Sequence, residues 1–594
     1  MRRYIRHLPD KPETKTRLRD LDQKTKAIVF KQIGLEKVTL LGAFIAMLLV
    51  TLASLSSPYI GKIAIDNFIA DNNKKDLLLS VLALIGLALL NWLGSFYRSY
   101  LTSLAGNRSI SRIREDLYKH ILDQSVSFFE KEKTGDIISR LSDDVSALSD
   151  LISSGLISLF GDLITLIGVV FIMLKLSPRL AWWLFISVPV VIYILRIFGY
   201  KIKSVYKTAR EKSAELTSGV EEDISGIKVV QSLNRQDYNA EVFSEKSKAA
   251  VKANVKATTS MAFLSPLMAL NQAGGLILIL LIGGSEVLKG RATIGTMLAF
   301  LSYSGQLYGP IAELTNFYTL LQTSLASLER ISDYMARKPA VPRPINPVSL
   351  IECRGEIEIT DLSFSYGELP LFRDFNLKIE AGETVAFVGP TGSGKSTLIN
   401  LIARLYDPTS GSIKIDGLDL RDIEPSFLRR HIGVVPQNVT LFAGSIKDNI
   451  AYAKKDATLN EVKEAAKRAM IHTYIESLPK GYDTEIGEAG KGLSGGQRQL
   501  ISYARAILLD PSILILDEAT SSVDAQTETA IKNALEEVLK NRTCIIIAHR
   551  FATLKYASRI ALLNQGRLEA WGTKEELMAT SLLFQELVAR QILA

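Results

Sequence analysis

The sequence predicts an α-helical transmembrane bundle of six spans fused to an α/β domain of the phosphate-loop type. Two observations carry this prediction. The first half of the chain contains six long apolar runs, and the second half alternates short β-rich runs with helical stretches around a glycine-rich loop. At 594 residues the chain also exceeds the usual size of one hydrophobic core, so we expect more than one domain.

The first apolar run is a clear membrane span. Residues 38–60 carry no charge and are long enough, at about 1.5 Å per residue, to cross a hydrocarbon core of about 30 Å. Only a few residues separate the third span from the fourth, so we expect these two to form a tight hairpin. The remaining spans are predicted at about 77–97, 156–176, 180–198, 261–283 and 294–316.

Charge predicts how the spans are oriented. The chain has 70 Lys and Arg against 62 Asp and Glu, and a net charge of +8 suits either nucleic acid or an anionic membrane surface. The basic residues gather in the leader 1–37 and in the connections 98–150 and 199–260, whereas the short connections contain few. This asymmetry predicts that the three basic segments are cytoplasmic. We expect no nucleic-acid partner.

The long connections and the linker predict the domain organisation. Both long connections have few helix breakers and read as helical stalks, with turns near Thr134-Gly135 and Ser225-Gly226. Helical character persists to about Arg337 and then breaks at several prolines. Cys353 and Cys544 are too few for a disulfide framework and fit a reducing compartment. The expected parts are a leader with an elbow helix (1–37), a transmembrane domain (38–337), a linker (338–351) and an α/β domain (352–594).

A phosphate-binding loop follows the apolar run TVAFVG. Backbone N–H groups of its glycines would surround phosphates, Lys395 would reach the β and γ oxygens, and Ser396 would bind Mg²⁺. A strand before the loop and a helix after it provide the context that the motif requires. The residues expected to bind ATP here are Gly389, Pro390, Thr391, Gly392, Ser393, Gly394, Lys395, Ser396 and Thr397.

Two acidic residues end a buried-strand pattern further along the chain. Ile513–Leu516 is continuously apolar and leads into Asp517 and Glu518. Taken alone, two acids after such a run are more often a solvated strand end. Together with the phosphate loop, they favour a nucleotide site in which Asp517 binds Mg²⁺ and Glu518 activates the attacking water.

Leu493-Ser-Gly-Gly-Gln497 lies between these two motifs and resembles the signature of the ATP-binding cassette (ABC) family. Other positions match that family in order: Tyr366 resembles the aromatic residue that stacks on adenine, Gln437 the Q-loop glutamine that also contacts Mg²⁺, Asp524 the D-loop aspartate, and His549 the switch histidine. A lone Tyr or His at such a place more often has a structural role. The ordered set favours the family assignment.

The membrane half resembles the same family. Its segments FFEKEKTGDIISRLSDDV and EEDISGIKVVQSL are similar to the intracellular loops of exporters. The whole chain thus resembles half-size ABC exporters, similar to bacterial multidrug exporters and the lipid A flippase. The resemblance implies a transport ATPase in a bacterial cell membrane, with ATP and Mg²⁺ as cofactors and Glu518 and His549 as catalytic residues.

The resemblance also implies a dimer. In this family the phosphate loop of one subunit closes over ATP against the signature of the other, so a second half-transporter is the expected partner. Both the signature and the acidic and histidine positions are intact, which favours a homodimer over a heterodimer. The residues expected to contact the partner's ATP are Ser494, Gly495, Gly496, Gln497 and Asp524.

The cargo is the least determined feature. We expect a hydrophobic or amphipathic substrate, either a drug-like molecule or a lipid, moved out of the cytoplasm or the inner leaflet by alternating access. A peptide exporter is an alternative, and an ATP-gated channel is a weaker one. Asp162 and Glu313 fall within predicted spans, where they could recognise a cation, form a structural pair or lie near lipid headgroups.

Overall fold

The structure is a computed structural model that describes residues 34–594, except 70, 72, 349–351, 368–369, 488–489, 518–524, 549–550 and 593–594. Most of the predicted leader lies outside the described residues. Contacts divide the chain into two units. The helical unit comprises Met1–Ile121 and Gly135–Ala336, and the α/β unit comprises Leu122–Thr134 and Arg337–Ala594.

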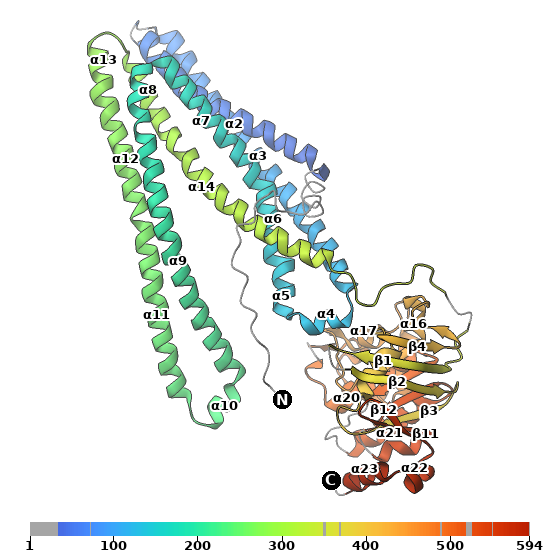
Figure 1. Ribbon diagram of the computed structural model, residues 1–594. Helices are drawn as coiled ribbons and strands as arrows, with labels where there is room; N and C mark the ends of the chain where they lie inside the picture. The colour runs from blue at the N-terminus through green and yellow to red at the C-terminus, as the bar shows by residue number, and fades with distance from the viewer. Residues whose placement is uncertain are drawn as a thin grey trace. The chain divides into compact units, whose positions relative to one another are not determined.

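The helical unit is built almost entirely from long helices (Figure 1). Single residues or short turns join most of them, and several short π-helical segments interrupt their length. The helices are α2 (Lys37–Ile63), α3 (Lys74–Leu122), α5 (Thr134–Ser139), α6 (Val145–Asp150), α7 (Leu156–Leu176), α8 (Pro178–Phe185), α9 (Ser187–Ser225), α10 (Ile227–Ser232), α11 (Gln236–Ala262), α12 (Leu264–Leu278), α13 (Gly284–Leu288) and α14 (Ile294–Ala336).

Among the described residues, four helical segments are long and apolar enough to cross a membrane: Lys37–Ile69, Lys74–Leu122, Thr134–Leu176 and Ala269–Leu288. Large hydrophobic side chains such as Leu82, Ile85 and Trp92 are exposed on α3, as expected of a surface in contact with lipid. The predicted spans 180–198 and 294–316 fall on α8 with α9 and on α14. Both are therefore helical, and the count of six spans stays a prediction.

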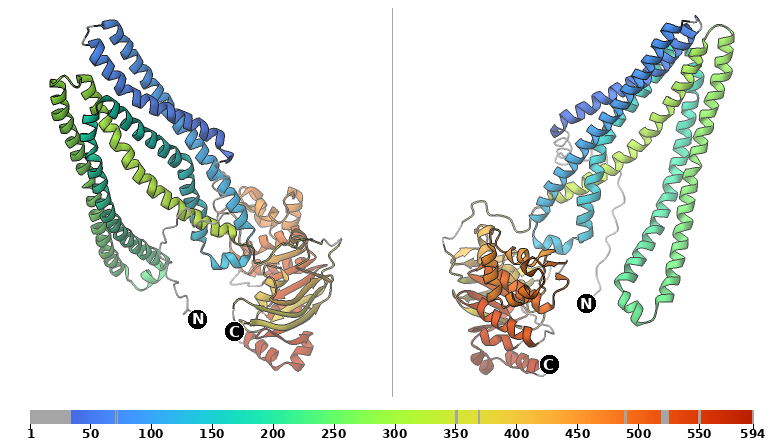
Figure 2. Two further views of the ribbon diagram at one scale, coloured as in Figure 1. Left: turned by 45° about the horizontal axis from the view of Figure 1, so that its top comes forward. Right: turned by 180° about the vertical axis from the view of Figure 1, so that it is seen from behind.

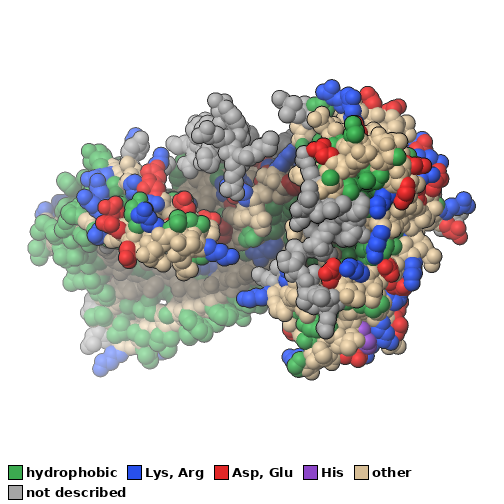
Figure 3. Space-filling model, turned by 90° about the horizontal axis from the view of Figure 1, so that it is seen from below, with side chains coloured by type: hydrophobic (Ala, Val, Ile, Leu, Met, Phe, Trp, Pro, Cys, Tyr) green, Lys and Arg blue, Asp and Glu red, His purple; other side chains and the backbone are tan. Residues whose placement is uncertain are grey.

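Hydrophobic side chains cover much of the helical unit's surface, whereas Lys, Arg, Asp and Glu are intermixed over the α/β unit (Figure 3). Charged side chains also gather at the end of the helical unit that faces the viewer. This division agrees with a bundle in contact with lipid and a domain in contact with water.

Packing inside the helical unit centres on α14. This helix contacts α2 and α7, and the fully buried Phe300 and Tyr303 share a core with Met173 and Leu184. The helices α9 and α11 lie side by side along their length in all views (Figures 1 and 2). The predicted hairpin between the third and fourth spans is present, because only Ser177 separates α7 from α8.

The stalk turns differ in part from the sequence prediction. At Gly226 α9 ends and the short helix α10 begins, as the Ser225-Gly226 prediction requires. The other predicted turn, near Thr134-Gly135, falls just before these residues, which form the first turn of α5. The chain turns on both sides of an additional helix, α4 (Val126–Lys131), which the contacts assign to the α/β unit.

The α/β unit contains three sheets. A six-stranded sheet has the order β12-β11-β3-β10-β9-β6, in which β12 alone is antiparallel to its neighbour. A four-stranded antiparallel sheet has the order β2-β1-β4-β5, and β7 pairs with β8. The strands are β1 (Ile357–Ser365), β2 (Pro370–Ile379), β3 (Thr384–Val388), β4 (Ser410–Ile415), β5 (Leu418–Asp419), β6 (Ile432–Val435), β7 (Gly444–Ser445), β8 (Glu485–Ile486), β9 (Ile513–Asp517), β10 (Thr543–Ile547), β11 (Arg559–Asn564) and β12 (Arg567–Gly572).

The six-stranded sheet is the core that positions the candidate site. Every residue of β10 is buried, as are Ile513–Leu516 of β9, because central parallel strands are covered on both faces. Their continuously apolar sequences predicted this. The helices of the unit are α15 (Lys395–Ile402), α16 (Pro425–His431), α17 (Ile446–Ala451), α18 (Leu459–Arg468), α19 (His472–Ser477), α20 (Gly495–Leu509), α21 (Ala525–Leu539), α22 (Lys574–Thr580) and α23 (Leu582–Ile592).

Candidate nucleotide-binding site

The phosphate-loop sequence forms a loop between a strand and a helix. It leaves the carboxyl end of β3 and enters α15 at Lys395. Gly392 and Gly394 have positive φ angles of 83° and 106°, which glycine adopts without steric cost. A Cβ atom on Gly394 would lie 2.6 Å from Cζ of Phe372, so this position has no room for a side chain. The loop therefore leaves its backbone free to surround an anion at the start of α15.

Lys395 is folded into this loop. Its Nζ donates hydrogen bonds to the carbonyl oxygens of Gly389, at 2.7 Å, and Pro390, at 2.9 Å. Burial lowers the pKa of the Lys395 ammonium, and the Asp517 carboxylate acts in the opposite direction. The cation is thus held where the phosphate loop concentrates backbone donors.

Tyr366 lies beside the first turn of α15. Its hydroxyl donates to Oγ1 of Thr397 at 3.3 Å. The ring packs edge-on against Phe364 and Tyr406, with centroid separations of 4.9 and 5.3 Å, and half of the side chain remains exposed. An aromatic ring held in this way, next to a phosphate loop, can stack on a base.

The parallel sheet brings further predicted residues to the same edge. Asp517 ends β9, and Gln437 follows β6, which pairs with β9. Ile547 at the end of β10 lies between Phe387 of β3 and Asp517 of β9 in the strand register. The carboxyl ends of parallel strands meet at one edge of a sheet, so the phosphate loop, Asp517 and Gln437 share that edge. Gln437 is exposed.

Three predicted residues lie outside the described residues: Glu518, Asp524 and His549. Sequence order still constrains two of them. Glu518 directly follows Asp517 at the end of β9, and His549 comes two residues after the end of β10. Their roles remain those that the sequence predicts.

The signature motif begins α20. Ser494 is the N-cap of this helix: its Oγ accepts from the Gln497 backbone N–H at 3.2 Å, and Oε1 of Gln497 accepts from the Ser494 backbone N–H at 2.8 Å. Ser494 and Gly495 are exposed, whereas Gly496 is buried. Among the described residues, no hydrogen bond joins this motif to the phosphate loop of the same chain. The exposed N-terminus of a 15-residue helix is suited to an anion.

The structure adds a residue that the sequence reasoning missed. Tyr406 donates a short hydrogen bond to Oε2 of Glu130 on α4, and its ring packs against Tyr366. Burial, together with the Glu130 carboxylate, raises the pKa of Tyr406, so the phenol keeps its proton. Because 276 positions separate the two residues, no local sequence signal could have identified this contact.

Other contacts fasten α4 within the α/β unit. Glu132 pairs with Arg337 at 2.6 Å, and the backbone N–H of Val341 donates to Oγ of Ser125 at 2.9 Å. Val126 packs against the core around β1 and β2. The segment Leu122–Thr134 is thus part of this unit although the chain around it belongs to the helical unit.

The acidic residues of the predicted spans also come together. Asp162 on α7 and Glu313 on α14 line one pocket of about 190 Å³ within the helical unit. Ser158, Asn316 and Phe317 contribute to its wall. The sequence could not pair these two acids, since 151 positions separate them.

A phosphate loop on a parallel sheet, in one chain with apolar helices long enough to span a membrane, defines a membrane transport ATPase. Comparison with known proteins agrees. Residues 40–311 match the family described as the ABC transporter transmembrane region, and residues 372–521 match the ABC transporter family. The chain therefore belongs to the ABC transporter family, as a half-size exporter that joins one transmembrane region and one ATPase domain.

Three similar proteins illustrate the relationship. An ATP-dependent lipid A-core flippase of Syntrophus aciditrophicus is 38% identical over 90% of this chain and 89% of its own. A Bacillus subtilis protein, provisionally named a multidrug export ATP-binding/permease protein, is 36% identical over 81% of this chain and 84% of its own. A bacterial Atm1-family ABC exporter with ATP bound superposes with a TM-score of 0.78 and 26% identity, covering 93% of this chain and 98% of that one.

Proposed function

We propose that the chain exports a hydrophobic or amphipathic substrate, a lipid or a drug-like molecule, by ATP-driven alternating access as a dimer. The observation that carries this proposal is the combination of a well-formed phosphate loop with apolar spans in one chain. The similarity to a lipid flippase and to a protein named for multidrug export supports both substrate classes.

In the proposed nucleotide site, the phosphate loop and Lys395 hold the phosphates of ATP, and Tyr366 stacks on the base. Ser396, Gln437 and Asp517 would hold Mg²⁺, and hydroxyl, amide and carboxylate oxygens are ligands that this ion accepts. When bound, the ion would neutralise charge on the phosphates. Among the described residues there is no cluster of three or more His, Cys, Asp or Glu for a metal ion.

The signature residues act on the other subunit's nucleotide in this proposal. Half-size exporters of this family typically dimerise. The exposed Ser494 and Gly495 at the N-terminus of α20 are available to a phosphate on a second copy. Glu518 would orient the attacking water, and His549 would stabilise the γ-phosphate. A homodimer suffices, because each copy supplies every predicted element.

The proposed topology follows from the distribution of charge. The leader 1–37, both long connections and the ATPase domain would be cytoplasmic, and the protein would lie in the cell membrane of a bacterium. We further propose the linear division into a leader, a transmembrane domain (38–337), a linker (338–351) and an ATPase domain (352–594).

A cationic amphiphile is a second candidate for the substrate. The pocket that Asp162 and Glu313 line supports it, since carboxylates at membrane depth tend to face a cavity or a cationic partner. The Asp162→Asn/Glu313→Gln double variant should then lose transport of a cationic dye and keep transport of a neutral lipid.

The proposal can be tested in inside-out vesicles. Uptake of a cationic dye and of a fluorescent lipid is measured with ATP, with wild type compared against Glu518→Gln at equal expression. We expect wild type to transport at least one of the two and the variant neither. Equal transport by both proteins would contradict an ATP-driven mechanism, and hydrolysis without transport of either probe would contradict the proposed substrate classes.

A further inference from the structure

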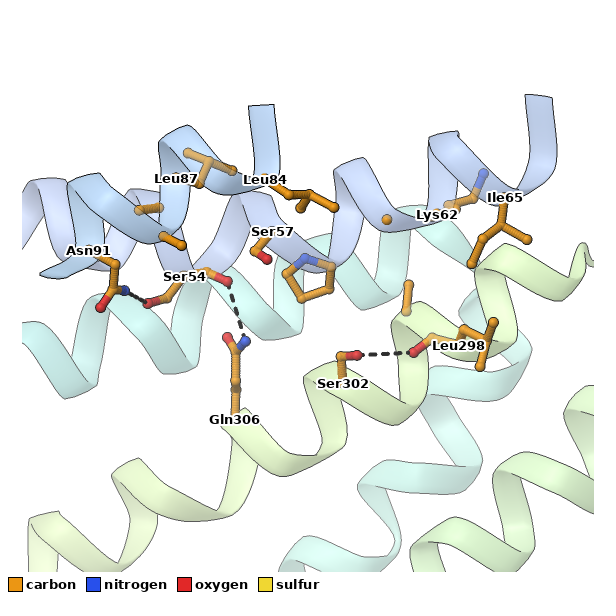
Figure 4. A pocket seen from close by; sticks show the side chains of 15 residues that line it. Ser54, Ser57, Lys62, Ile65, Leu84, Leu87, Asn91, Leu298, Ser302 and Gln306 are labelled. Carbon is orange, nitrogen blue, oxygen red and sulfur yellow. Dashed lines mark hydrogen bonds between the residues drawn. The ribbon is translucent and has the colours of Figure 1, made fainter. Parts of the chain in front are cut away.

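A cavity of the helical unit has about 630 Å³ and lies between α2, α3 and α14 (Figure 4). Each helix contributes a single stripe to its wall, with residues spaced by three and four positions as on one face of a helix. The stripes are Ser54, Ser57, Pro58 and Gly61 on α2; Leu84, Leu87, Ala88 and Asn91 on α3; and Leu298, Ala299, Ser302 and Gln306 on α14. Ala53, Lys62 and Ile65 complete the wall.

A proline sets the polar chemistry of this cavity. Pro58 has no backbone N–H, so the carbonyl of Ser54, four residues earlier, loses its helical donor. The side-chain amide of Gln306 donates to this carbonyl at 3.3 Å, and Asn91 donates to the Ser54 hydroxyl at 2.8 Å (Figure 4). This carbonyl also fixes the orientation of the Gln306 amide. Only the NH₂ group of the amide can donate a hydrogen bond, so the NH₂ group faces the carbonyl and Oε1 faces away from it.

The wall keeps an acceptor for a ligand at Ser302. Oε1 of Gln306 is buried and has no hydrogen-bond partner among the described residues. Ser302 uses its single hydroxyl proton on its own helix, at the Leu298 carbonyl 3.2 Å away, and keeps its oxygen as an acceptor. The Gln306 oxygen is shielded from the cavity, whereas Ser302 is exposed. The Ser302 oxygen is therefore the acceptor that hydroxyl or amide N–H donors of a ligand can reach.

The rest of the wall excludes other ligand classes. The described residues that line it include no aromatic ring and no carboxylate, so none of them favours an aromatic cation. Its one charged residue, Lys62, is paired with Asp66 at 2.9 Å. Leu84, Leu87 and Leu298 offer aliphatic surface. The wall therefore fits a molecule with hydroxyl groups at one end and a saturated chain at the other.

We infer that this cavity binds the hydroxyl-bearing glycerol or sugar region of an exported lipid, with the start of an acyl chain against the leucines. The inference rests on the proposed export function and names the substrate class. A cavity of this volume is in the range of small-ligand sites and is too small for a whole diacyl lipid. With the N-terminus of α2 cytoplasmic, the cavity lies in the outer half of the membrane, on the release side.

The test uses the full-length protein in nanodiscs and a glucosyl diacylglycerol that carries a photoreactive diazirine near the glycerol end of one acyl chain. After photolysis, mass spectrometry locates the adduct, which we expect within 84–91 or 298–306. Ala88→Phe fills the cavity, and Ala83→Phe places the same ring on an exposed, non-lining position of α3. Adduct formation should fall about tenfold or more in Ala88→Phe, the loss that about 1.4 kcal/mol of clash produces, and should persist in Ala83→Phe.

Three further readouts make the test decisive. Unlabelled lipid should compete for labelling, whereas tetraphenylphosphonium, an aromatic cation, should not. The KM for transport of the same lipid should rise in Ala88→Phe together with the loss of adduct. If Ala88→Phe does not give a folded dimer with ATPase activity, Ser302→Leu fills the cavity from another helix.

Adducts at residues outside the cavity would overturn the inference. Adduct formation that is as strong in Ala88→Phe and Ser302→Leu as in wild type would also overturn it. Loss of the adduct with unchanged lipid transport would also overturn it, because the cavity would then hold a resident lipid and not the cargo. Failure of the proposed function has a different signature, namely equal lipid transport by wild type and Glu518→Gln.

Discussion

At the residue scale, the proposed nucleotide site contains the buried ammonium group of Lys395. Lys395 is 7% exposed and fixed by two carbonyls of its own loop. The same geometry that lowers its pKa places the ammonium among the backbone donors that would receive phosphate. Burial of a charge is unfavourable, Asp517 offsets part of this cost, and a bound phosphate would offset more of it.

Removal of this ammonium should abolish hydrolysis. We expect Lys395→Ala to lower the ATPase rate on the order of 100-fold or more, because a preorganised charge on the transferred phosphate is lost. The rate of phosphate release from purified protein in nanodiscs measures this. Lys532→Ala on the exposed face of α21 is the matched control and should keep the wild-type rate. A Lys395→Ala variant of near-normal activity would contradict the site.

Tyr366 should contribute to ATP affinity through its ring and not its hydroxyl. Tyr366→Ala should raise the KM for ATP by about 5- to 150-fold, since stacking on a base contributes about 1–3 kcal/mol. Tyr366→Phe keeps the ring and should change the KM little. The comparison uses ATPase kinetics over a range of ATP concentrations, and an equal effect of both substitutions would point to the Thr397 hydrogen bond instead.

At the element scale, α4 is joined to the α/β unit by Tyr406, which also contacts the candidate base-stacking ring. Loss of the hydroxyl in Tyr406→Phe should leave basal hydrolysis near wild type and weaken substrate-stimulated hydrolysis by about tenfold or more. The expected change corresponds to about 1.5–3 kcal/mol for a hydrogen bond to a charged group. Glu130→Gln completes a double-variant cycle, and effects that simply add would show that the two side chains act independently.

The proline in α2 gives a second prediction at this scale. Gln306→Leu leaves the Ser54 carbonyl without a donor and should destabilise the helical unit by about 0.5–2 kcal/mol. Pro58→Ala restores the backbone N–H, so the double variant Pro58→Ala/Gln306→Leu should recover part of this loss. Thermal unfolding in detergent measures the difference. If Pro58→Ala worsens Gln306→Leu, the carbonyl is not the group that Gln306 serves.

At the scale of the whole molecule, the proposed nucleotide site combines residues from two copies of the chain. In the described residues the signature and the phosphate loop each form hydrogen bonds within themselves, and the signature's first residues are exposed. A single chain therefore presents two half-sites, its phosphate loop and its signature. In a two-fold dimer each half-site would face the complementary half-site of the other copy, which gives two complete sites.

Mixing two inactive chains should restore activity. Dimers of Lys395→Ala and dimers of Ser494→Arg should both be inactive. In a mixed dimer, one composite site carries both substitutions and the other carries neither, so part of the ATPase activity should return. Differently tagged chains allow the mixed dimer to be purified for the assay. If the mixed dimer is folded but completely inactive, the result would contradict one of two assumptions: that each nucleotide site is composite, or that the two sites of a dimer act independently.

Local patterns along the chain predicted much of the fold. The apolar runs, the proline-rich break after the last helix and the strand-loop-helix context of Gly389–Thr397 all depend on neighbouring residues, and the structure places them as predicted. The turn expected near Thr134-Gly135 lies directly before it, where α4 ends at Lys131 and α5 begins at Thr134. The separate helix α4, which packs through Val126, was not predicted from the sequence.

The sequence by itself determined the class of protein, because its motifs encode local backbone conformations and residue chemistries that survive without knowledge of the fold. Only the tertiary structure decided which distant residues meet: Tyr406 with Glu130, Asp162 with Glu313, and Gln306 with the carbonyl that Pro58 orphans. These pairs join elements separated by more than a hundred residues. Their contact depends on how helices and strands pack, which no single segment of the sequence specifies.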